Sequence, residues 1–169
     1  MQIRRRFLIL TAALMLAAAA QAAAPAYRLL GARAPDFALK ATSGTNFRLS
    51  EYRGEVVLLG FWGSRCTQCA AQLAALSRLI DTYSSAGLRA FAVNVDDDQL
   101  AAAEFAIAHP VSFPVLLDPQ KEVAREYRID ALPMLVLVDR SGVVRQVHRE
   151  FSRDSEARYL EQIRVLLDE

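Results

Sequence analysis

Apolar and polar positions divide the chain into short apolar runs and longer segments with helical spacing. Residues 56–61 are a continuous apolar run, which is typical of a strand buried on both faces. Residues 66–85 carry apolar side chains at helical spacing and are predicted to form an amphipathic helix, with Gly87 as its C-cap. The apolar side chains of that helix are Leu73, Leu76, Leu79 and Ile80.

The remaining pattern predicts further strands and helices in alternation. Asp97 or Asp98 is expected to cap one helix, which ends before His109-Pro110, and Pro119 is expected to open another. The predicted strands cover residues 88–95, 113–117, 134–138 and 143–147, and the predicted helices run to about 108, over 119–127 and over 152–167.

Two hairpins complete this pattern. Residues 35–49 alternate in polarity around a turn at 42–45, and residues 139–142 join the last two predicted strands. Strands that alternate with helices and end in a hairpin and a helix predict an α/β sandwich around a mixed sheet. We expect one domain, residues 34–169.

The first 22 residues are predicted to be a cleaved signal peptide. Three arginines at 4–6 precede an uncharged apolar run at 7–20, and Ala20-Gln21-Ala22 offers a small-x-small cleavage pattern. The run is shorter than the roughly 20 residues that a membrane span needs. Arg4 and Arg5 also resemble a twin-arginine signal, but the apolar run favours the ordinary secretory route. We therefore expect export to a periplasm, with residues 23–33 as a leader or flexible tether.

Composition excludes several classes of protein. The 169 residues carry 20 basic and 19 acidic side chains, and loss of residues 1–22 removes three arginines, which leaves 147 residues with a net charge of −2. This balance does not favour capture of nucleic acid. Two cysteines are too few for a small disulfide-stapled scaffold.

The strongest chemical signal is Cys66-Thr67-Gln68-Cys69, where the buried strand at 56–61 gives way to a helix. Amides at a helix N-terminus stabilise a thiolate, so the pKa of Cys66 is expected to lie below the roughly 8.5 of a free thiol. Cys69 lies one helical turn further on, on the more buried side. This arrangement suits an exchange in which Cys66 reacts at the surface and Cys69 resolves the mixed disulfide.

Other interpretations of the two cysteines are weaker. A structural disulfide closing so short a loop constrains the unfolded chain little. A zinc site would need two more ligands, and His109 and His148 are not arranged as a second pair. A chance pair of small buried residues is the remaining alternative.

A proline precedes the strand predicted at 134–138. Pro133 alone would be explained by an edge position or a simple turn.

Taken together, these features resemble the thioredoxin-like superfamily, in particular its exported TlpA/ResA-like branch. The similarity runs from Ala34-Pro35-Asp36-Phe37 through residues 49–54 and Phe61-Trp62 to residues 139–142. It implies a thioredoxin-like fold with a central mixed β-sheet flanked by helices and an N-terminal hairpin extension. It also implies that Cys66 attacks and Cys69 resolves.

The resemblance implies further roles at the site and a set of partners. Pro133 would be a cis-proline facing the cysteines, Leu132 would offer backbone hydrogen bonds to a substrate, and Trp62 and Arg65 would support the site. The expected partners are protein thiols or disulfides, with apocytochrome c or a metallochaperone as possible clients and a membrane electron donor of the DsbD type. No nucleic acid, metal or cofactor is expected, and the protein is expected to be a monomer.

Four positions depart from the family pattern. Arg65 replaces the usual tryptophan before the first cysteine, and its charge would favour the Cys66 thiolate. The familiar proline between the cysteines is missing. Gln72 stands where related reductases often have an acid, and Gly60 where thioredoxin has a buried aspartate. The sequence therefore offers no obvious general base for Cys69.

Two alternative functions remain open. A peroxiredoxin-type peroxide reductase shares the fold, but its usual threonine or serine and proline are missing before either cysteine. A Cu(I)-binding chaperone could use the dithiol, although Met134 is the only methionine after residue 22. Peroxide consumption and copper titration separate these alternatives from a disulfide reductase.

Overall fold

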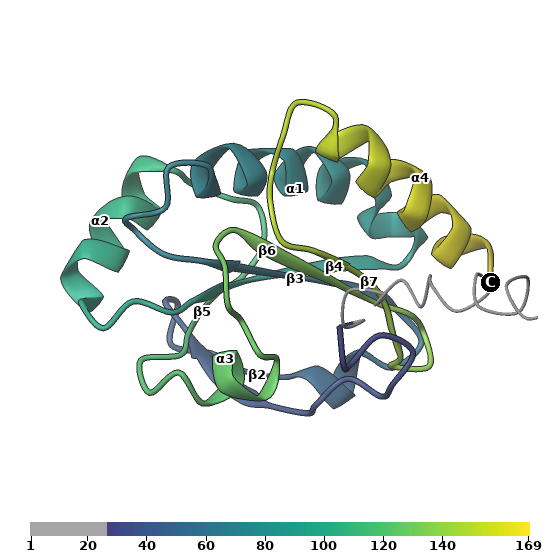
Figure 1. Ribbon diagram of the computed structural model, residues 1–169, viewed down its shortest axis with the longest axis horizontal. Coiled ribbons are helices and arrows are strands. Elements are labelled where there is room, and N and C mark those ends of the chain that lie inside the picture. Colours follow the sequence, from purple (N-terminus) through teal and green to yellow (C-terminus); the bar gives the residue numbers. More distant parts are fainter. Residues whose placement is uncertain (1–26) are drawn as a thin grey trace, which may run out of the picture.

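The computed structural model describes residues 27–169, so the predicted signal peptide and its cleavage site lie outside the described residues. A seven-stranded mixed sheet in the order β2-β1-β5-β4-β3-β6-β7 forms the centre. Figure 1 shows α1 and α4 along one face of this sheet and α3 on the other. Within residues 27–169, none of the helices has the length and apolar character needed to span a membrane.

The elements follow the predicted order. The strands are β1 Ala38–Ala41, β2 Asn46–Arg48, β3 Val56–Trp62, β4 Leu88–Asn94, β5 Val115–Leu117, β6 Met134–Val138 and β7 Val144–His148. The helices are α1 Cys69–Tyr83, α2 Gln99–Ala108, α3 Glu122–Glu126 and α4 Ser155–Asp168, with short 3-10 turns at Leu49–Tyr52 and Ser84–Ala86.

Strand β3 lies next to the middle strand, β4, and is buried along its whole length. It pairs in parallel with β4 and antiparallel with β6. Successive side chains of a strand point to opposite faces, so Leu58 and Trp62 enter the core under α1 and α4, while Leu59 and Phe61 enter the core on the α3 side. The β3 segment carries no polar side chain because both faces of the sheet are covered there.

The N-terminal hairpin is confirmed, and it extends the sheet. Strand β1 pairs antiparallel with β2 on one side and with β5 on the other. The second predicted hairpin is confirmed as the antiparallel pair of β6 and β7. The predicted α/β sandwich is therefore the observed architecture.

Three helices begin later than expected, and one of them, α4, begins at Ser155 instead of Ser152. Helix α1 begins at Cys69 instead of Cys66, because Cys66 lies in a turn where its amide donates to the Gly63 carbonyl at 3.1 Å. Helix α3 begins at Glu122 instead of Pro119, because the Asp118 carboxylate accepts from the amides of Glu122 and Ala124 and so caps the chain three residues later. The Asp98 cap of α2 is confirmed, with Oδ1 accepting from the amides of residues 100 and 101.

The described part of the leader is packed against the domain, which differs from the flexible tether expected there. The Tyr27 hydroxyl donates to the Tyr127 carbonyl. The Gly31 amide donates to the Val144 carbonyl at 2.8 Å, and Leu29 packs against the core on the α3 side. Residues 27–33 are therefore held against the domain by hydrogen bonds and apolar contacts.

A buried carboxylate holds the connection between β6 and β7. Asp139 accepts from the amides of Ser141 and Val143 at 3.0 and 2.9 Å, from the Ser141 hydroxyl at 2.7 Å and from Arg145 at 3.1 Å. Burial opposes its charge, but the hydrogen bonds from Val143, Ser141 and Arg145 outweigh burial and hold the pKa of Asp139 below its usual value.

Replacing Asp139 with asparagine is expected to lower the free energy of unfolding of the oxidised protein at pH 7 by about 1–3 kcal/mol. A depressed native pKa contributes stability above the unfolded-state pKa of roughly 3.9, and this contribution is lost as the pH falls through the native value. The deficit should therefore shrink towards pH 3. Urea unfolding at both pH values measures it, with the exposed Asp97→Asn as the control. An equal deficit at both pH values would contradict the assignment.

Candidate active site

The two cysteines lie at the end of β3, where the sheet gives way to α1. Strand β3 ends at Trp62, and a turn of three residues leads to Cys66. Cys66 is half-buried and Cys69 is fully buried, as the sequence pattern predicted. Their sulfurs form a disulfide with the Cα atoms 5.4 Å apart. The structure thus represents the oxidised state of the pair, with the sulfur of Cys66 on the side nearer to solvent.

The strand register brings Pro133 to the end of β3, where the segment that leads to Cys66 begins. Phe61 on β3 pairs antiparallel with Met134 on β6, so the residue before Met134 lies beside the residues that follow Phe61. The Leu132–Pro133 peptide bond is cis, as the resemblance implied. Leu132 is 38% exposed and lines the same cavity as Cys66.

Gly63 allows these two segments to approach each other. A Cβ atom at this position would lie 3.0 Å from Asp96 Oδ1 and 3.2 Å from Leu132 Cδ1. Real Cβ atoms rarely make contacts this close, so a larger residue would require the side chain of Asp96 or of Leu132 to shift by a few tenths of an ångström.

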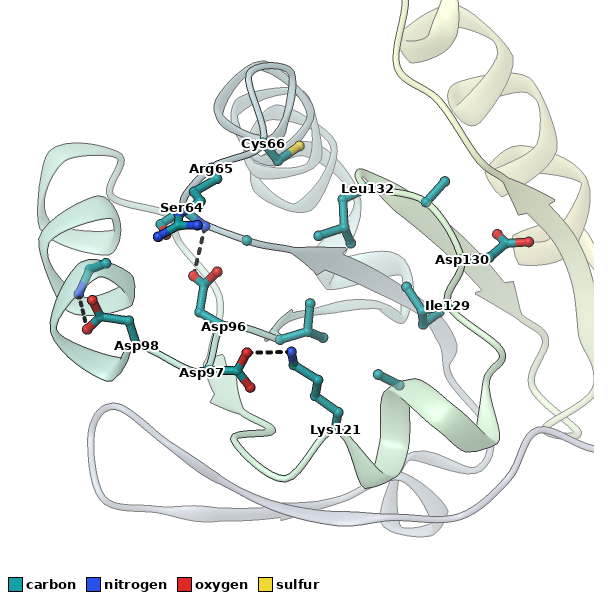
Figure 2. A pocket seen from close by; sticks show the side chains of 15 residues that line it. Ser64, Arg65, Cys66, Asp96, Asp97, Asp98, Lys121, Ile129, Asp130 and Leu132 are labelled. Carbon is teal, nitrogen blue, oxygen red and sulfur yellow. Dashed lines mark hydrogen bonds and ion pairs between the residues drawn. The ribbon is translucent and has the colours of Figure 1, made fainter.

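Asp96 is part of the site, and sequence reasoning missed it. Its Oδ2 accepts from the Ser64 amide at 2.7 Å and from the buried Asn94 Nδ2 at 2.9 Å, as Figure 2 shows for Ser64. Trp62 and Asn94 end the parallel strands β3 and β4 side by side, so the residues that follow them meet at this edge. Asp96 therefore holds the turn before Cys66. The available signal was an acidic residue directly after the strand predicted at 88–95.

A cavity of about 690 Å³ opens beside Cys66. Figure 2 shows Cys66 and Leu132 on its upper side, Asp96 and Asp97 on the side where β4 ends, and Lys121, the residue before α3, below. The Lys121 ammonium group pairs with the Asp97 carboxylate at 2.8 Å across the lower part of this cavity. Cys66 and Leu132 both line this cavity, so a group that enters it lies beside Cys66.

Trp62 and Arg65 differ in how they relate to the cavity. Arg65 is exposed and lines the cavity. Trp62 is buried and does not line it. Its ring stacks on Phe105 of α2 at 4.8 Å between centroids, so any support that Trp62 lends to the site comes from the core beneath it.

Gln72 and Gly60, two of the positions that depart from the family pattern, lie close together near Cys69. Gln72 is fully buried, and its Nε2 donates to the Tyr159 hydroxyl at 3.2 Å. Its Oε1 has no hydrogen-bond partner within residues 27–169 and lies 3.8 Å from where a Cβ of Gly60 would be. A neutral amide thus occupies the space beside β3, next to the helical turn that begins with Cys69.

Known proteins share this arrangement of sequence and fold. A family model described as AhpC/TSA matches residues 30–147. The chain is 35% identical over 136 residues to the thiol-disulfide oxidoreductase ResA of Geobacillus kaustophilus, which covers 80% of this chain and 78% of the relative.

Solved structures show the same fold. A putative thiol:disulfide interchange protein DsbE from Chlorobium tepidum is 33% identical, with a TM-score of 0.78 over 82% of this chain and 97% of that one. A putative protein disulfide isomerase from Bacteroides thetaiotaomicron is 27% identical, with a TM-score of 0.76 over 83% and 91%. The predicted thioredoxin-like fold is confirmed.

Proposed function

The chain belongs to the AhpC/TSA family and is a thiol-disulfide oxidoreductase, and from this premise we propose that it reduces disulfides of exported proteins through Cys66 and Cys69. The observation that carries the proposal is the unequal exposure of the pair. Cys66 borders an open cavity, while Cys69 is fully buried behind it.

This geometry supports a two-step exchange. In the reduced protein, the Cys66 thiolate attacks a substrate disulfide, and one substrate sulfur leaves as a thiolate that takes up a proton. Cys69 then loses its proton and attacks the sulfur of Cys66 in the mixed disulfide, which releases the second substrate thiol. Two electrons have passed to the substrate, and the Cys66–Cys69 disulfide of the structure is restored.

Neighbouring residues would orient the substrate. The backbone of Leu132, before the cis bond to Pro133, would pair with an extended substrate segment in the cavity. Arg65 would place a positive charge on the cavity wall and favour the Cys66 thiolate. Asp96 would keep the turn before Cys66 in place through the Ser64 amide.

The cellular setting is part of the same proposal. The charged start, apolar run and small-x-small pattern of residues 1–22 support export to a periplasm, where disulfides of client proteins persist. A membrane electron donor of the DsbD type would return the disulfide to the dithiol. Apocytochrome c or a metallochaperone would be suitable clients, and the protein would act as a monomer.

The direction of electron flow is tested by equilibrating the purified domain with glutathione and with dithiothreitol buffers. For a reductase we expect a potential at or below the roughly −270 mV of thioredoxin, so that the disulfide resists glutathione and opens only with dithiothreitol. Alkylation followed by mass spectrometry counts the free thiols. A disulfide that glutathione opens readily would make the protein an oxidant and overturn the proposed direction.

A further inference from the structure

A second cavity, of about 660 Å³, lies between the described leader and α3. Tyr27 and Ile129 contribute to its walls. Its charged side chains come from four separate segments, which are the leader, α3 with the residue before it, the loop after α3 and the residue that follows β7. They comprise five cations and one carboxylate, Arg28, Lys121, Arg125, Arg128, Arg149 and Asp130.

The carboxylate of Asp130 does not neutralise the positive charge of the second cavity. Asp130 is paired with Arg149 at 3.4 Å. Lys121 is paired with Asp97 on the side of the first cavity. Arg125 donates to a backbone carbonyl, that of Gln120, which leaves its charge uncompensated. Within residues 27–169, Arg28 and Arg128 make no ion pair. At least three positive charges therefore remain around this cavity in a domain whose overall charge is slightly negative.

The wall that carries these cations is held in place by the fold. Tyr27 donates its hydroxyl to the Tyr127 carbonyl, and burial raises the pKa of Tyr27 to about 12, so the hydroxyl keeps its proton. The Arg149 guanidinium lies 5.7 Å from the centre of the Tyr27 ring. Arg128 adopts a left-handed backbone with φ of 50°, a conformation that residues with a side chain seldom take.

The second cavity continues the first. Lys121, Ala124, Ile129 and Asp130 line both. In Figure 2 the carboxylate of Asp130 points away from the Cys66 sulfur, and its partner Arg149 belongs to the second cavity. A polypeptide lying against Cys66 and Leu132 can therefore extend past Ile129 to the cationic cavity without leaving the surface of the protein.

We infer that the second cavity binds an acidic segment of the same partner protein whose cysteines react at Cys66. This inference rests on the proposed function. Continuity of the two cavities favours a polypeptide, because a lipid headgroup or a free phosphate would have no need of the Cys66 cavity. Complementary charge mainly accelerates encounter and selects among partners, and its effect weakens as salt screens it.

The inference is tested with peptides that contain one disulfide and either four glutamates or four glutamines, placed before or after the cysteines with spacers of several lengths. Reduced protein should reduce the best glutamate peptide about tenfold faster than its glutamine counterpart at low salt, and this preference should fade in high salt. The double substitution Arg28→Glu with Arg125→Glu should abolish the preference without slowing reduction of the glutamine peptide.

A matched pair of charge reversals elsewhere provides the control. Lys40 on β1 and Arg153 before α4 are exposed and line neither cavity, so Lys40→Glu with Arg153→Glu changes the net charge equally and should retain the preference. Equal rates for all peptides, or a preference lost equally in both double variants, would overturn the inference while leaving the proposed function intact. Failure to reduce even the glutamine peptide would instead count against the proposed function. Binding to anionic lipid vesicles with no peptide preference would also overturn the inference.

Discussion

Replacing Cys66 with serine is expected to reduce the rate of insulin reduction to the uncatalysed background, whereas replacing Cys69 with serine is expected to trap a mixed disulfide at Cys66. The difference follows from exposure. Cys66 borders the open cavity and can meet a substrate disulfide, while Cys69 is fully buried and can reach only the sulfur of Cys66. A hydroxyl cannot replace the nucleophilic thiolate in either step.

Insulin turbidity measures the first effect, and mass spectrometry of the non-reduced Cys69→Ser protein after incubation with a peptide disulfide measures the second. Thr67→Ala is a suitable control, because Thr67 is exposed between the cysteines and has no sulfur to exchange. If both cysteine variants kept wild-type activity, the dithiol mechanism would be wrong. If the adduct formed on Cys69 in the Cys66→Ser variant instead, the roles of the two cysteines would be reversed.

Replacing Gln72 with glutamate is expected to destabilise the oxidised protein at neutral pH and leave it nearly unchanged at pH 4. The side chain is fully buried between Tyr159 and the space above Gly60, so the charged form of a carboxyl there would lose its hydration. Burial of this kind raises a carboxyl pKa by roughly two to three units, which corresponds to about 3–4 kcal/mol at neutral pH.

The direction in which the stability of the Gln72→Glu variant changes with pH follows from proton binding. Between the unfolded-state pKa of roughly 4.3 and the raised native value, the unfolded chain has lost a proton that the native protein keeps, so stability falls as the pH rises. Urea unfolding at pH 4 and pH 7.5 measures the change. The exposed Gln146→Glu is the control and should change stability by less than about 0.5 kcal/mol at both pH values. A pH-independent loss would show that packing, and not charge, limits this position.

The same variant also addresses the missing base. A carboxyl at position 72 would lie beside the turn of α1 that begins with Cys69, where the wild-type protein offers only an amide. We expect Gln72→Glu to speed the resolution of the mixed disulfide by Cys69, because a titratable group near the reacting pair can accept the thiol proton. Stopped-flow fluorescence of the reduced protein with a peptide disulfide would follow this step.

Local patterns were sufficient for much of the fold. The apolar run of β3 predicted a strand buried on both faces, the acidic residues before α2 predicted a cap at Asp97 or Asp98, and both predicted hairpins are confirmed. The start of α3 was wrong, because Asp118 caps the chain through its side chain and delays the helix to Glu122. The start of a helix depends on which backbone amides the capping carboxylate reaches, and the spacing of residues along the sequence does not determine this.

The sequence by itself determined the reacting pair, since Cys66 and Cys69 are close along the chain and follow a buried strand. Only the tertiary structure decided what surrounds them. Asp96 reaches Ser64 because β3 and β4 end together, and Gln72 faces Gly60 because α1 packs against β3. The cationic cavity likewise joins the leader, α3 and Arg149, which follows β7. Residues far apart in sequence meet through strand register and helix packing, and these depend on the whole core instead of any local pattern.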